Sequence, residues 1–280
     1  PVVKAKKNIV EATAFLELAR IFQSMGLASG AKEKAADGLD RVDYVIRSRT
    51  PIPSSLRQEA FKLKWELHMA ADDLARAVAT CVTFNQLFPD SPFVDQALMG
   101  IAKVRIEEKQ YREAIDILGQ IMNLPRSEVK AEAAFKIAEI VELEEKKVKG
   151  GGSDGSVQHY KLVAERYPDS EYAGPALAKV VDYYINAKDY AGANSLLEQV
   201  FQDHPDAKFL DSMLLKWVLV SYRMGDYRKA SERCSQLLFQ YPESACAATA
   251  KNLLPKIEAN LKSKTEAAVK PEAGKGQEQQ

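Results

Sequence analysis

Prolines recur at a nearly constant spacing along this 280-residue sequence, and their regularity constrains the fold more than any other feature. Six prolines are separated by 36, 36, 43, 37 and 37 residues, at positions 53, 89, 125, 168, 205 and 242. The longer interval contains the glycine-rich stretch KGGGSDGS at 149–156, interpreted as a flexible insertion of about six residues that hides the period. Such a period predicts an array of similar structural units.

Each unit has the pattern of a helix, a turn and a second helix. In ALAKVVDYYI at 176–185, apolar residues follow the spacing i, i+3, i+4, i+7, i+8 of an amphipathic helix. A second apolar stripe runs from Tyr190 to Phe201 and ends before Pro205, since proline disfavours helical geometry in the preceding residue. A helical hairpin of this size cannot bury its apolar face alone, so neighbouring hairpins are expected to stack.

Short, similar loops end these units: FPDSPF at 88–93, YPDSEY at 167–172, HPDAKF at 204–209 and YPESAC at 241–246. We expect each loop to end one hairpin and to direct the chain into the next. Aromatic neighbours such as Phe88 and Phe209 are expected to wedge between hairpins. Asp95 and Asp211 fall near the predicted start of the following helix and are predicted to be N-caps.

The start of the second helix resembles the tetratricopeptide repeat. GDYRKA at 225–230, followed by Pro242, has the turn, tyrosine, small residue and proline of that family, and KDYAGA at 188–193 and KQYREA at 109–114 repeat it. The resemblance implies an all-α, right-handed α-solenoid of helix-turn-helix repeats. We expect a single solenoid over 1–262, with a degenerate repeat at 6–49, repeats at about 53–243, a capping helix at 244–262 and a disordered tail at 263–280.

Composition argues against several other classes of protein. Lys+Arg and Asp+Glu both number 39, so the basic excess of a general nucleic-acid binder is absent. No apolar run is long enough to span a bilayer, and no direct membrane insertion is expected. The three histidines and three cysteines form no ligand-spaced cluster, so we expect no metal, no cofactor and no catalytic residue.

The resemblance implies that the first helices of the hairpins line a concave face, which in this family receives an extended peptide or a helix of a partner protein. The middle of this face is acidic with Met and Phe, so the predicted partner segment carries basic and apolar side chains. The alternative is a solvated face, and for the apolar stretch 213–224 it is packing between repeats. The predicted partner-binding residues are Glu66, Met99, Lys103, Phe135, Glu139, Asp182, Leu215, Leu219, Tyr222 and Arg223.

The sequence therefore predicts a non-catalytic scaffold for protein–protein interaction, with homo-oligomer formation left open. The 36–37-residue period with YPDS loops is similar to that of bacterial envelope proteins of this family. That similarity implies a role in envelope assembly and a periplasmic or outer-membrane-associated location, with a cytoplasmic location as the alternative. Two other hypotheses are a peptidoglycan-associated module, which would expose aromatic residues on one face, and the repeat segment of a larger enzyme.

Overall fold

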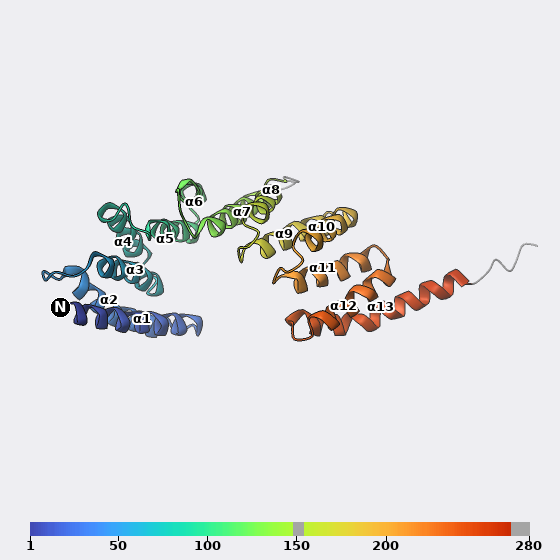
Figure 1. The fold of residues 1–280 in the computed structure, drawn as a ribbon, viewed down its shortest axis with the longest axis horizontal. Helices are drawn as coiled ribbons and strands as arrows, with labels where there is room; N and C mark the ends of the chain where they lie inside the picture. The colour runs from blue at the N-terminus through green and yellow to red at the C-terminus, as the bar shows by residue number, and fades with distance from the viewer. Residues whose placement is uncertain (148–153, 270–280) are drawn as a thin grey trace, which may run out of the picture. The chain divides into compact units, whose positions relative to one another are not determined.

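The computed structural model describes residues 1–147 and 154–269, and over these residues all regular structure is α-helical. The helices follow one another as hairpins, and a last long helix ends the array (Figure 1). Their bounds are α1 (Val2–Ser24), α2 (Ala28–Arg47), α3 (Ser54–Ala70), α4 (Leu74–Leu87), α5 (Val94–Glu107), α6 (Tyr111–Asn123), α7 (Lys130–Lys147), α8 (Gly155–Arg166), α9 (Ala173–Asn186), α10 (Tyr190–Asp203), α11 (Leu210–Arg223), α12 (Tyr227–Gln240) and α13 (Ala245–Val269).

The chain divides into two compact units, residues 1–156 (unit 1) and residues 157–280 (unit 2). The prediction of one continuous solenoid over 1–262 stays a prediction. The predicted end of the last helix at 262 was too early, because α13 continues to Val269. Most residues from Leu261 to Ala268 are good helix formers (Leu, Lys, Glu and Ala), and the segment contains neither Gly nor Pro, which accounts for the extra turns despite the low apolar content. The rest of the predicted tail, 270–280, and most of the predicted insertion lie outside the described residues.

Unit 1 is an α-solenoid in which each helix packs on the next. In addition, α1 contacts α3 and α3 contacts α5, so the first helices of successive hairpins lie side by side. Three apolar clusters succeed one another along the unit, and their most deeply buried large side chains include Leu67, Phe84 and Leu118. The repeated apolar stripes of the sequence thus form one seam through the stacked hairpins.

Unit 2 has the same construction. The helices α9 and α11 contact each other, as do α11 and α13, while α10 and α12 pack on their hairpin partners. Leu197 and Met213 are fully buried in one apolar cluster, and Leu214, Leu237 and Ile257 in the next. The second cluster includes Ala250 and Ile257 of α13, which therefore packs against the last hairpin.

Five hairpins turn through the same backbone geometry. In each of these hairpins, the residue that follows the C-cap of the first helix has a positive φ of 59–74°. These residues are Gly26, Asp72, Lys109, Lys188 and Gly225. The next amide then bonds back to a carbonyl of the first helix, as in Asp226 N to Ser221 O at 3.0 Å, which is the Schellman arrangement. The predicted tyrosines follow directly, because α6, α10 and α12 begin at Tyr111, Tyr190 and Tyr227.

The loops between hairpins also share one geometry. Each of the four loops begins at an aromatic residue, or at His204, whose backbone carbonyl accepts a hydrogen bond from the amide three residues later, as in Ser91 N to Phe88 O. A second bond of the same spacing follows, as in Val94 N to Ser91 O. Phe88 contacts the Phe61 and Phe84 rings, with centroids 5.8 and 5.4 Å apart. The repeated loop of the sequence is therefore a repeated structure.

Asp95 and Asp211 are not the N-caps that the sequence predicted. Each lies inside the first turn of its helix, after the N-caps Phe93 and Phe209, and its carboxylate accepts a hydrogen bond from the serine of the next loop. The aspartates that do cap helices start the second helices: Asp73, Asp189 and Asp226 accept from Arg76 N, Gly192 N and Lys229 N. The hairpin pattern alone did not distinguish these two uses of aspartate.

Candidate functional site

The first helices of unit 1 enclose a groove of about 450 Å³. Its floor is apolar, formed by Trp65, Met69, Met99 and Gly100 of α3 and α5. Gly100 lets α5 pack closely on its neighbours, since a Cβ there would lie 3.3 Å from the Cys81 sulfur of α4. Charged and amide side chains from α1, α3, α5 and α7 form the walls. A concave, apolar-floored site with polar walls is the usual form of a site that binds a ligand or a peptide side chain.

A second hollow of about 610 Å³ adjoins this groove between α1 and α3. The two hollows share Arg20 and Glu66, and the second continues along Glu59 and Lys62 to Phe93 at the loop. Together they follow the first-helix side of unit 1 along α1, α3, α5 and α7. We call them the unit 1 groove.

Ion pairs between successive first helices cross the unit 1 groove. The Arg20 guanidinium of α1 lies 3.2 Å from the Glu66 carboxylate of α3, and the Lys103 ammonium of α5 lies 2.9 Å from the Glu132 carboxylate of α7. All four side chains are partly exposed, so each pair contributes little to stability, about 0–1 kcal/mol. Their charges are therefore available to exchange for those of a bound segment at low cost.

The walls of the 450 Å³ hollow carry an excess of negative charge. Four carboxylates line it, those of Glu66, Asp72, Glu107 and Glu132, against the two cations Arg20 and Lys103. Asp72 and Glu107 are exposed, and no ion pair is recorded for either among the described residues. This local excess is notable in a chain whose overall net charge is zero, and it favours cationic groups.

Of the predicted residues in unit 1, the structure brings Glu66, Met99 and Lys103 together on this groove. Met99 is only 3 % exposed and belongs to the apolar floor. Phe135 and Glu139 lie on α7 outside the groove lining, half-buried, and Glu139 lies 3.7 Å from Lys136. The prediction for these five residues stays a prediction as far as binding is concerned.

Sequence reasoning missed several groove residues. Arg20 and Gln23 come from α1, Asp72 from the α3–α4 turn and Glu107 from the end of α5. The degenerate first repeat carries no family motif from which an inward position could be counted. The acidic residues at the ends of helices were visible in the sequence but have no fixed register in the repeat.

The remaining predicted residues lie on α9 and α11 of unit 2. The Asp182 carboxylate of α9 is 2.5 Å from the Lys216 ammonium of α11, an ion pair between first helices like those of unit 1. Leu215 and Tyr222 are half-buried and pack against the last apolar cluster. Tyr222 accepts a hydrogen bond of 2.8 Å from the Asn260 amide of α13. Leu219 and Arg223 are exposed.

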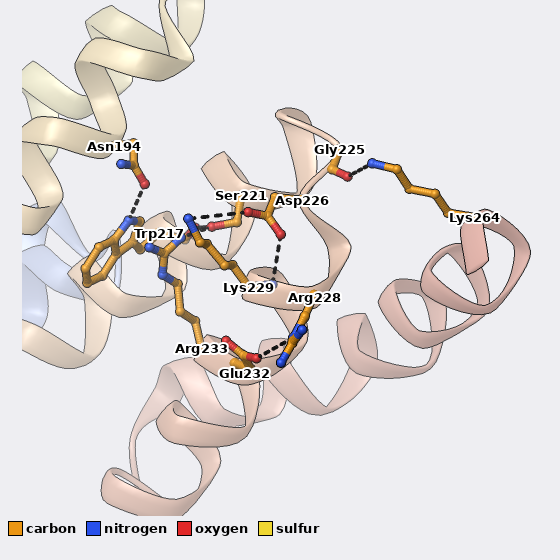
Figure 2. Close-up of polar contacts among 10 residues, drawn as sticks. All are labelled: Asn194, Trp217, Ser221, Gly225, Asp226, Arg228, Lys229, Glu232, Arg233 and Lys264. Atoms are coloured by element: carbon orange, nitrogen blue, oxygen red, sulfur yellow. Dashed lines mark hydrogen bonds and ion pairs between the residues drawn. The ribbon is translucent and has the colours of Figure 1, made fainter. Parts of the chain in front are cut away.

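The apolar stretch 213–224 is covered on most sides. Leu214 and Val218 are fully buried, and the Trp217 ring lies between the Phe201 ring, 5.1 Å away, and the Arg233 guanidinium, 3.8 Å from its centre. Figure 2 shows Trp217 beside Arg233, with Trp217 Nε1 donating a hydrogen bond to Asn194 Oδ1 at 2.9 Å.

Arg233 also donates a hydrogen bond to the Ser221 hydroxyl, and burial lowers the pKa of its guanidinium from the ordinary value. The contacts of Trp217 and Tyr222 agree with packing between repeats, which leaves Leu219 and Met224 as the exposed large apolar residues of this stretch.

No group of three or more His, Cys, Asp or Glu residues is placed to hold a metal ion among residues 1–147 and 154–269. Burial raises the pKa of the Cys81 thiol to about 12, and it also raises the pKa of Cys234, whose sulfur lies 3.2 Å from the Ala250 carbonyl oxygen. Both thiols are therefore poor nucleophiles at neutral pH. Of the helices described, none is long and apolar enough to cross a membrane.

Among the described residues of each unit, exposed large aromatic side chains do not gather on one face. Tyr44 of α2 and Phe239 of α12 are the two with substantial exposure, and they belong to different units. The peptidoglycan hypothesis, which needed an aromatic face, has no observation in its favour within this part of the chain.

Comparison with known proteins shows the fold. No protein-family model and no curated protein matches the sequence. The apo form of RapI is similar in structure, with a TM-score of 0.53 at 12 % identity, over 94 % of this chain and 88 % of that one. Weaker similarities are to Pseudomonas aeruginosa pilF (TM-score 0.47, 12 % identity, 88 % and 99 % covered) and to YrrB, described as a TPR protein with an unusual peptide-binding site (0.42, 17 %, 69 % and 91 %).

The chain is thus an α-solenoid with tetratricopeptide-like hairpins. Its own structure supports this description, because the motif tyrosines open the second helices and one turn geometry recurs in five hairpins. Identities of this size show the fold alone.

Proposed function

We propose that this protein is a scaffold whose unit 1 groove holds a segment of a partner protein carrying basic and apolar side chains. The observation that carries the proposal is the groove's composition, an apolar floor of Trp65, Met69 and Met99 between walls with more carboxylates than cations. Apolar anchors on the floor would supply most of the affinity, and the charges would select the segment.

Charge complementarity accounts for the expected polarity of the segment. A lysine or arginine of the partner segment would contact the carboxylates of Asp72 and Glu107, which are accessible because both side chains are exposed. An acidic segment would face four carboxylates against two cations, and binding to Arg20 or Lys103 would leave Glu66 or Glu132 without its ion-pair partner. Like charges brought together in this way reduce affinity.

The test uses Trp65 as a reporter of the groove. The chain has two tryptophans, so a Trp217→Phe variant leaves Trp65 as the only tryptophan signal. Peptides selected from a random display library on this variant are expected to be enriched in Lys or Arg next to Met, Leu or Phe, and to change Trp65 fluorescence on binding. Selection of acidic peptides, or of peptides that leave Trp65 fluorescence unchanged, would contradict the proposal.

Charge reversal provides the matched comparison. Glu107→Lys places a cation in the groove wall and should weaken binding of the selected peptides at least tenfold, about 1.4 kcal/mol. Asp116→Lys makes the same change in charge on the exposed part of α6, outside the groove, and should leave binding unchanged. Equal effects of the two substitutions would show that net charge, and not the groove, governs binding.

The cellular setting is a further part of the proposal. The YPDS-type loops support a partner involved in bacterial envelope assembly, with the protein in the periplasm or at the outer membrane. Cell fractionation of the native organism checks this location. Recovery of the protein in the cytoplasmic fraction would remove the envelope setting while leaving the groove proposal intact.

A further inference from the structure

Helix α1 is apolar on two opposite faces. One face is buried against α2 and α3 through Ala5, Ile9, Ala12, Leu16 and Ala19. The other is uncovered, and its large apolar side chains remain strongly exposed: Val3 82 %, Val10 69 %, Leu18 42 %, Ile21 53 % and Met25 64 %. A turn of about 100° per residue places these five, with Lys7 and Ala14, in one stripe opposite the buried face. We call it the α1 stripe.

An uncovered stripe of this kind is unusual, because helices that are apolar all round are normally buried on both sides. The long helix of unit 2 differs, since α13 exposes mainly polar residues, including Lys251, Asn252, Lys256, Glu258 and Lys262. Contiguous exposed apolar surface on the scale of the α1 stripe indicates an interaction site.

The α1 stripe is symmetric about its centre. Val10 and Leu18 lie four residues on either side of Ala14, and Val3 and Met25 lie eleven residues on either side. If a second α1 crosses antiparallel at Ala14, Val10 faces Leu18 and Val3 faces Met25, while Ile21 lies against the aliphatic part of Lys7. The small alanine at the crossing lets the helices approach closely. Such a contact has two-fold symmetry and is self-complementary, as a dimer interface must be.

The charges on α1 favour the antiparallel orientation. Lys4, Lys6 and Lys7 all lie near the N-terminal end, so a parallel pair would bring the two groups of lysines together. In an antiparallel pair they lie over the C-terminal half of the other helix, near Glu17 and the partial negative charge of the helix end. The acids beside the stripe are already paired, Glu11 with Arg41 at 2.9 Å and Glu17 with Arg20 at 2.7 Å, so they do not repel across the contact.

We propose that the α1 stripe is the interface of a homodimer, in which α1 packs antiparallel on α1 of a second copy of this chain. The helix is about 34 Å long, and one stripe per copy gives an interface near or below the roughly 1,200 Å² of standard stable complexes. Because small interfaces are typical of weak complexes, we expect a dissociation constant on the order of micromolar.

Sedimentation velocity over a range of protein concentrations tests the dimer. The wild type is expected to change from monomer to dimer as its concentration rises through the micromolar range. Leu18→Lys should weaken dimerisation at least tenfold, whereas Val82→Lys, at an equally exposed apolar position on α4, should not. A wild type that stays monomeric to about 1 mM, or equal dimerisation of the two variants, would overturn the proposal.

Cysteine cross-linking tests the orientation, in a Cys246→Ser background that leaves the buried Cys81 and Cys234. Val3→Cys mixed with Met25→Cys should form a disulfide between copies under mild oxidation, while Val3→Cys alone should not. Cross-linking of Val3→Cys with itself would show a parallel pair and contradict the antiparallel interface. Glu33→Cys, exposed on α2 away from the stripe, is the control for random collision.

Discussion

The Ser127 hydroxyl, in the loop before α7, donates a hydrogen bond of 2.8 Å to the Asp95 carboxylate of α5. The same carboxylate oxygen accepts from the Glu128 amide at 3.1 Å, so one buried side chain ties a loop to the helix of the preceding hairpin. The contact recurs between equivalent residues in other repeats, Ser91 with Gln58 and Ser244 with Asp211. At the place where the loop residue is Ala207, the helix residue is Gly174, and both polar partners are absent together.

We expect Asp95→Ala to lower the free energy of unfolding of unit 1 by about 1–3 kcal/mol, because Asp95 is 5 % exposed and its loss leaves the Ser127 hydroxyl and the Glu128 amide without their partner. Urea denaturation followed by Trp65 fluorescence in the Trp217→Phe background measures the change. Asp116→Ala, which removes an exposed carboxylate of α6, should have an effect within about 0.5 kcal/mol. If Asp95→Ala is as mild as this control, the contact does not stabilise the repeat.

The sequence predicted the hairpins well because proline spacing, apolar periodicity and the motif tyrosines are all local signals. It could not predict the role of Asp95, since the contact joins residues 32 positions apart in different repeats. Glu66, Met99 and Lys103 could be placed on one face from the sequence because inward positions follow from the repeat register, and their role in binding stays a prediction. The pairing of Glu66 with Arg20 and of Lys103 with Glu132 depends on how two neighbouring helices are offset, which a single repeat does not specify.

The positive φ shared by the hairpin turns predicts that removing glycine from this position lowers the free energy of unfolding, and that introducing glycine there raises it. Gly225 has a φ of +74°, and an added Cβ would meet only the Lys264 ammonium at 3.9 Å, so Gly225→Ala tests backbone strain without a steric clash. It should lower the free energy of unfolding by about 1–2 kcal/mol. Lys188 occupies the same turn position at a φ of 59°, and Lys188→Gly should raise that free energy by up to about 1 kcal/mol, since the added chain entropy offsets part of the relieved strain.

Both variants lie in unit 2, and Trp217 fluorescence in a Trp65→Phe background reports their unfolding. Ala187→Gly, one residue earlier at a right-handed helical φ of −72°, is the matched control and should be destabilising. If Lys188→Gly and Ala187→Gly both stabilise the protein, or if neither does, the positive φ is not the cause.

Alanine at Tyr222 and at Leu219 separates packing from docking on α11. Tyr222 contacts the Tyr227 ring, with centroids 5.4 Å apart, and accepts a hydrogen bond from Asn260, so Tyr222→Ala should lower the free energy of unfolding by about 1–3 kcal/mol. Leu219 is 37 % exposed, and Leu219→Ala should cost less than about 1 kcal/mol. Thermal and urea denaturation with Trp217 as the reporter provide the values. Similar large losses for both variants would mean that Leu219 is also part of the packing.

Burial of His68 predicts a loss of stability in mild acid. The side chain, on α3, is 5 % exposed, and its Nδ1 has no hydrogen-bond partner among the described residues. Burial lowers the pKa of His68 below its ordinary value, and the charges of Asp73, Lys64, Arg76 and Asp43 act on it more weakly. The folded state therefore holds the neutral imidazole, whereas the unfolded chain takes up a proton below about pH 6.5.

The sign follows from this difference. Above about pH 6.5, His68 is neutral in both the folded and the unfolded state and adds no pH dependence. As the pH falls below that value, only the unfolded state gains the proton, so the free energy of unfolding decreases. Denaturation of unit 1 at pH 7.5, 6.0 and 5.0, followed by Trp65, should show this decrease in wild type and less of it in His68→Phe. His204→Phe, in unit 2, should leave the decrease in unit 1 unchanged. An identical pH dependence in wild type and His68→Phe would show that His68 does not stay neutral in the folded protein.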